Sequence, residues 1–174
     1  MKNFDSSFSE RQLAVFRRCI GKTLISIDTD QMTFFHNRSF GEDFNFYSPV
    51  ILHFGGDDYL LLEGGEDRKG DRVLSVNKQN TPSPLNFAFN EYGNHEKEDV
   101  SGIMVLKTIK NVTLYAFGDA PSEGTEELDT AVVFDLEDNS CLCFVPAAYG
   151  TGLCVNDVLI AQKLEHSYAR WSAK

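Results

Sequence analysis

The sequence lacks positive charge over nearly a third of its length. No Lys or Arg occurs between Asn111 and Gln162, although nine carboxylates do, and these account for almost the whole formal net charge of −10. Elsewhere acids and bases nearly balance. Nucleic-acid binding needs clustered cations to displace the counterions of the phosphates, and anionic membranes repel an acidic surface. The charge therefore argues against nucleic acid and membrane, and it favours a cationic partner, with solubility alone as the alternative explanation.

Catalytic and cofactor motifs are also missing. The sequence has no GxGxxG, GxxxxGK(S/T), GxSxG, HExxH or CxxC. No apolar run approaches the length needed to cross a bilayer, and the first thirteen residues lack the apolar core and cleavage site of a secretory signal. We therefore predict a cytoplasmic protein that is not an enzyme and needs neither a cofactor nor a metal.

Cysteine is scarce, with four residues in the chain. Cys141 and Cys143 lie two apart on a predicted strand, so their side chains share one face. They are interpreted as small core residues, with a metal or redox pair as the alternative. Neighbours on one face of a strand lie about 6.5–7 Å apart, beyond disulfide reach, so no bond between them is expected.

Strand signals dominate what the sequence does contain. It is 42% hydrophobic with 14 Phe residues, which suits a β-rich core in a single domain over residues 1–174. Two strand–turn–strand patterns occur, at 50–62 around GGDD and at 130–145 around EDNS. Strands are also expected at 103–109 and 112–117, with a break between them.

Helices are predicted at both ends of the chain. Ser7 and Glu10 form a capping box for a helix over residues 7–20. A second helix is expected from Asn156, because apolar residues then recur every three or four positions as far as Trp171. The intervening segments 37–48, 64–70 and 77–99 are rich in glycine, proline or polar residues and are predicted to be loops and turns.

The expected fold is α+β, mainly antiparallel β, with N-terminal and C-terminal helices. Segments 7–76 and 100–155 show a similar order of strand, connection and hairpin. One interpretation is an internal duplication that gives two four-stranded meanders, packed face to face or crossed, with the helices covering open ends. The other is that any two antiparallel hairpins share this pattern.

A few polar residues lie at spacings that suggest chemistry. His53 is close to the aspartates of the GGDD turn and could act as a base oriented by a carboxylate, but a strand histidine facing solvent is favoured. Asp28, Asp30 and His36 could bind a divalent cation, but an Asp-rich turn is the commoner explanation. A β-rich ligand-binding or enzymatic domain without a recognisable motif therefore stays as the alternative function.

The predicted N-terminal helix carries three arginines on its exposed face. They are Arg11, Arg17 and Arg18. They are interpreted as a solvated face, and a phosphate site is the alternative.

The acidic stretch provides the main functional hypothesis. Its carboxylates are densest in the loop from Asp119 to Asp129, with more at the hairpin turn Glu137–Asp138. Like charges this close repel one another, and a basic protein partner would offset that cost and bind faster. The predicted partner-binding residues are Asp119, Glu123, Glu126, Glu127, Asp129, Glu137 and Asp138.

The layout resembles a class of toxin-neutralising proteins. A strand that begins Gly21-Lys22 and continues through Leu24, followed by the hairpin ILHFGGDDYLLL, is similar to the small acidic immunity proteins of contact-dependent inhibition and polymorphic-toxin systems. The resemblance is one of composition and architecture, and no functional residue is carried over from it. It implies an inhibitor that covers the active site of a basic cognate toxin, such as a nuclease.

Overall fold

A computed structural model describes residues 4–29, 32–33, 43–46, 49–83, 88–89, 95–96, 101–121, 123–147 and 150–174. These residues form two helices and a set of antiparallel strands, as the sequence predicts. Their bounds are α1 Glu10–Arg17, β1 Thr23–Thr29, β2 Met32–Thr33, β3 Phe44–Phe46, β4 Val50–His53, β5 Tyr59–Glu66, β6 Arg72–Gln79, β7 Ala88–Phe89, β8 His95–Glu96, β9 Ser101–Phe117, β10 Asp129–Leu136, β11 Cys141–Ala147, β12 Gly150–Cys154, α2 Asp157–Leu164 and β13 Ser167–Ser172.

Each half of the chain contains a four-stranded antiparallel meander. In the first, β1, β4, β5 and β6 are neighbours in that order, and in the second, β9, β10, β11 and β12 follow the same pattern. β3 and β2 extend the second meander beyond β12, and β13 pairs with β9. Both predicted hairpins, β4–β5 and β10–β11, are therefore confirmed.

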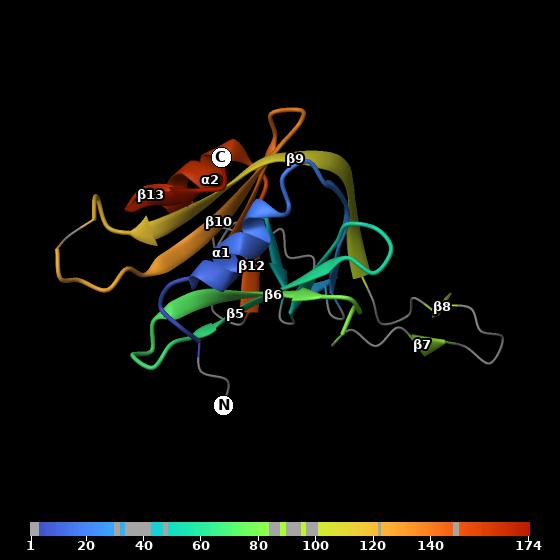
Figure 1. Cartoon of the computed structure of the whole chain (residues 1–174), viewed down its shortest axis with the longest axis horizontal. Coiled ribbons are helices and arrows are strands. Elements are labelled where there is room, and N and C mark those ends of the chain that lie inside the picture. The colour runs from blue at the N-terminus through green and yellow to red at the C-terminus, as the bar shows by residue number, and fades with distance from the viewer. Residues whose placement is uncertain are drawn as a thin grey trace.

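The two meanders are joined through one long strand. β9 pairs with β1 along its first half and with β10 along its second, so the predicted break inside it is wrong. Its register shifts beside Leu106, which has a φ of 52°, and again beside Lys110. Such bulges bend a strand, so β9 passes from one layer to the other and the sheet folds over on itself (Figure 1).

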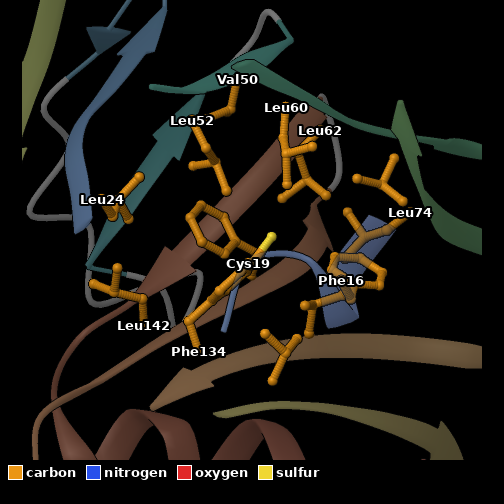
Figure 2. Close-up of a cluster of buried hydrophobic side chains, with 14 of the residues drawn as sticks. Phe16, Cys19, Leu24, Val50, Leu52, Leu60, Leu62, Leu74, Phe134 and Leu142 are labelled. Atoms are coloured by element: carbon orange, nitrogen blue, oxygen red, sulfur yellow. The ribbon is translucent and has the colours of Figure 1, made fainter. Parts of the chain in front are cut away.

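The core lies between the two layers and is closed on one side by α1 (Figure 2). Alternation along the strands turns Leu52, Leu60 and Leu62 inward, and each is 3% exposed or less. Phe16 of α1 reaches Phe134 of β10 edge to face, with ring centroids 6.2 Å apart. Full burial of each such side chain stabilises the fold by about 1.5–3 kcal/mol.

The first helix begins later than predicted. Its capping box uses Ser9 and Gln12 in place of Ser7 and Glu10, because the same pattern occurs again two residues further on. The amide of Phe8 donates to the Asp129 carboxylate at 2.6 Å, which holds residue 8 outside the helix.

The second helix ends earlier than predicted. Asn156 caps α2, as expected, but the helix stops at Leu164 and the chain continues as β13, paired with β9. The helical spacing of Tyr168 and Trp171 was coincidental, and both aromatic residues favour a strand next to an available edge. α2 lies on the outer face of the second meander, where Leu164 joins an apolar cluster, and not over an open end.

Three predicted loops contain strands. Residues 44–46 of the segment 37–48 form β3, β6 runs on to Gln79, and β7 pairs with β8 inside 77–99. The rest of 37–48 lies outside the described residues, apart from Asp43. A turn in the segment 64–70 begins only after Glu66, because β5 continues through its two glycines.

At Gly64 the two layers approach each other closely. Its amide donates to Thr151 Oγ1 at 2.9 Å, and a Cβ at this position would overlap the carbonyl oxygen of Gly150. At Gly65 the three atoms nearest to a Cβ would all belong to the ring of Phe4, a side chain near the start of the chain.

We expect Gly64→Ala to lower the free energy of unfolding by about 1–3 kcal/mol, because backbone must move to accommodate the methyl group. Gly65→Ala is the matched control and should cost clearly less, because the Phe4 side chain can rotate away. Urea denaturation of the two variants measures the difference. Equal stabilities would contradict the close approach of β5 and β12.

Candidate partner-binding loop

The predicted acidic loop joins β9 to β10 and projects beyond the ends of both strands (Figure 1). Its base is closed by backbone hydrogen bonds from Phe117 to Leu128, at 2.8 Å, and from Gly118 to His166, at 2.7 Å. Asp119 and Glu123 are exposed and form no ion pair with any residue that the structure describes. These two carboxylates are therefore open to a partner.

Asp129 was predicted to belong to this exposed surface, and that prediction is wrong. The residue is 2% exposed and accepts two hydrogen bonds from the Arg170 guanidinium, at 2.7 and 2.6 Å. It also accepts the Phe8 amide. As the first residue of β10 its side chain points inward, where it joins β13 to the segment before α1.

Two more loop carboxylates are neutralised within the chain. Glu126 pairs with Lys69 of the β5–β6 turn, and Glu127 pairs with Arg170 at 3.2 Å. The hydrogen bond from Lys69 lowers the pKa of Glu126. The repulsion that we expected a partner to offset is therefore partly offset by bases that lie far away in the sequence.

The β5–β6 turn is itself tied to this network. Ser6 Oγ donates to Asp67 at 2.7 Å, and the Ser6 carbonyl accepts the Asp129 amide at 2.9 Å. The hydrogen bond from Ser6 lowers the pKa of Asp67, so this link is complete near neutral pH and weakens as Asp67 becomes protonated in acid. The base of the loop is thus held by segments from both ends of the chain.

The hairpin turn lies away from the loop. Glu137 and Asp138 follow the last residue of β10, whereas the loop precedes its first, which separates them by roughly 25 Å at the rise of a strand. Asp138 pairs with Lys107 at 2.6 Å, and hydrogen bonds from Lys107 and Ser140 hold its pKa well below the usual range. Glu137 is exposed. The expected single acidic surface is therefore two separate ones.

Comparison with known proteins gives no further guide to this loop. No protein-family model, curated protein or solved structure matches the chain. No helix among the described residues is long and apolar enough to span a membrane. The loop is therefore interpreted from its own geometry.

His53, which was considered as a base but interpreted as a strand histidine facing solvent, is half-buried and has other contacts. His53 stacks on Tyr59 at 4.6 Å between ring centroids, and its Nε2 lies 3.2 Å from the Gly56 carbonyl oxygen. Ser26 stands opposite His53 in the sheet, but its hydroxyl donates to Asp28 at 2.9 Å. The arrangement lacks the contact between nucleophile and base that acyl transfer requires.

The residues considered as an alternative metal site, for which an Asp-rich turn was the favoured interpretation, are only partly covered by the structure. Asp30 and His36 lie outside the described residues. Within the described ranges no group of three His, Cys, Asp or Glu side chains could hold a metal ion. The side chain of His95 is likewise not described.

The cysteines are free thiols, and three of the four are buried. Cys143 and Cys154 stand opposite each other on β11 and β12 within the apolar cluster beneath α2. Burial raises the pKa of Cys19 to about 12 and that of Cys141 to about 11. Their environment fits the interpretation as core residues, since a reactive thiol needs a lowered pKa.

Sequence reasoning missed three residues of this site. Phe117 is 64% exposed at the base of the loop, although its apolar strand suggested burial. Lys69 and Arg170 were not connected to the acidic stretch, because each lies outside it in the sequence. The sequence did contain one signal for these two cations, namely the absence of bases inside the acidic stretch. Any carboxylate of the stretch that is buried must then pair with a cation from another part of the chain.

Proposed function

We propose that this chain is a non-enzymatic protein-binding inhibitor of the immunity-protein kind. Its loop, residues 118–128, would enter the substrate site of a basic partner, such as a nuclease toxin. The observation that carries the proposal is the geometry of the loop. It projects from the sheet, and its base is fixed by hydrogen bonds and ion pairs. Asp119, next to this base, and Glu123, in the middle of the loop, are unpaired within the described structure.

The fixed base supports this function energetically. A loop that is already ordered loses little conformational entropy on binding, so more of the contact energy appears as affinity. Glu126 and Glu127 contribute to this order by holding Lys69 and Arg170, so they act as positioning residues. Asp119 and Glu123 are left to act as the contacts.

The composition of the surface supports a protein partner. Phe117 is an exposed aromatic side chain next to unpaired carboxylates, and central aromatic anchors often dominate the energy of protein interfaces. A nuclease must be basic where it binds phosphate, so carboxylates can occupy that site. Complementary charge would also raise the association rate and make it dependent on salt.

The test is a double charge reversal, Asp119→Lys with Glu123→Lys. The binding assay uses as partner any basic toxin domain found encoded beside this chain, or a basic protein captured from the host lysate and then purified. We expect affinity to fall about 10- to 100-fold, or roughly 1.4–2.8 kcal/mol. The salt dependence of the association rate should also become less steep.

The matched control is Asp57→Lys with Asp157→Lys. It changes the net charge equally at two exposed positions, in the β4–β5 turn and at the start of α2, that lie away from the loop. The control should bind with nearly the original affinity. Equal losses in both variants, or no loss in the loop variant, would show that the loop is not the binding site.

A further inference from the structure

Three of the 16 bases of this acidic chain line a groove between α1 and the end of β6. The groove has a volume of about 560 Å³, and Arg11, Arg18 and Lys78 line it. Asn80 adds an amide, and Asp57 of the β4–β5 turn adds a carboxylate. This volume lies within the range of sites that bind small molecules, roughly 300–1,000 Å³.

The fold fixes the positions of these side chains. Arg11 and Arg18 are seven residues apart, so they lie on the same face of α1, separated by about 10 Å along its axis. Between them, Ala14 and Val15 leave room for a ligand. Two contacts fix the position of α1 against β6. Phe16 is buried in the core, and Gln12 Nε2 donates to the Val76 carbonyl oxygen at 3.4 Å.

The three cations meet in one groove without forming an ion pair within the described structure, although acids outnumber bases 26 to 16 in this chain. Four other bases are paired. Those that form ion pairs are Lys22, Lys69, Lys107 and Arg170. Arg11, Arg18 and Lys78 pair with no residue that the structure describes. The single carboxylate of Asp57 offsets only part of the repulsion among three cations in one groove, and the remainder raises the free energy of the fold.

The stability of α1 accounts for the position of only one of the three groove cations. Arg18 caps the C-terminus of α1, where a cation interacts favourably with the helix dipole. Arg11 lies in the first turn, where the dipole disfavours positive charge. Its position is therefore costly for the helix and favourable for a bound anion.

We propose that this groove binds a compact polyphosphate, either free or as the tail of a nucleotide. Guanidinium groups form paired hydrogen bonds with phosphate oxygens, and Lys78 would add a point charge. Several adjacent phosphates would contact both arginines, whose long side chains converge from two turns of one helix. A long nucleic acid would instead run out of the groove onto the acidic surface, so the ligand is small.

Calorimetric titration with tripolyphosphate and with ATP tests the assignment, with citrate as a carboxylate of comparable charge. Tripolyphosphate should bind with a Kd in the micromolar range at low salt, and Arg11→Gln with Lys78→Gln should weaken it at least tenfold. Tighter binding of ATP would identify a nucleotide as the source of the phosphates, and equal binding would identify the free polyphosphate.

The control variant is Arg17→Gln, on the same helix but stacked on Trp171 and not part of the groove. It should retain the affinity of the unaltered chain. An equal loss in Arg17→Gln would reduce the effect to net charge and overturn the proposal. So would the absence of binding at millimolar tripolyphosphate, or citrate binding as tightly as tripolyphosphate. Melting curves of both variants establish that each is folded.

Discussion

Replacing Arg170 with Met is expected to lower the free energy of unfolding by about 3–5 kcal/mol, because it leaves the buried Asp129 carboxylate without its cation. Asp129 is 2% exposed and the Arg170 side chain 14% exposed, so water cannot replace the lost contacts easily. Glu127 would lose its ion pair as well. Urea denaturation at neutral pH, at constant ionic strength, measures the change.

Two comparison variants make this result specific. Lys69→Met removes an exposed ion pair with Glu126 and should cost less than about 1 kcal/mol. Adding Asp129→Leu to Arg170→Met removes the unpaired charge and should restore part of the stability. If Arg170→Met were no more destabilising than Lys69→Met, the buried pair would not support the fold.

Deleting residues 156–174 is expected to abolish cooperative unfolding at 25 °C. The deletion removes Arg170, the strand β13 and the apolar side chains of α2 that cover the second meander. The apolar side chains of α2 are partly buried, so each contributes less than the roughly 1.5–3 kcal/mol of full burial, and loss of the Arg170 pair adds several more. The sum reaches the 5–15 kcal/mol by which domains are usually stable.

The effect is measured by thermal unfolding followed by circular dichroism. A variant with Val158→Ser and Glu165→Gln serves as the control, because both positions are exposed within the deleted segment. Its Tm should stay within a few degrees of the original. A deletion variant that melts cooperatively near the original Tm would show that the C-terminal segment is dispensable.

Local signals predicted the hairpins, whereas long-range pairing decided the elements that were missed. GGDD and EDNS are turn sequences between apolar runs, and their geometry requires no information from elsewhere in the chain. β13 forms because it can pair with the edge of β9. The sequence pattern of residues 167–172 contains no information about that distant edge. Long-range pairing also decides β9, which continues through two bulges where the sequence predicted a break between two strands.

The candidate site was predicted in outline from charge alone. The acidic run located the projecting loop correctly, because the distribution of acids and bases is visible in the sequence. It did not indicate which carboxylates are paired, since Lys69 and Arg170 approach from distant segments. In the sequence, Asp129 and Glu123 both look like exposed loop carboxylates. The structure distinguishes them, because the side chain of Asp129 is buried at the start of β10 whereas that of Glu123 is exposed.

The shared strand β9 has a consequence for the order in which the chain can fold during synthesis. β1 is made early, yet one of its two neighbours in the sheet is β9, from the other half of the chain. Contacts so distant in sequence require closure of a large loop and form slowly. Until residues 101–117 have left the ribosome, one edge of β1 has no partner strand. The core of the first meander therefore cannot close before β9 of the second meander is available.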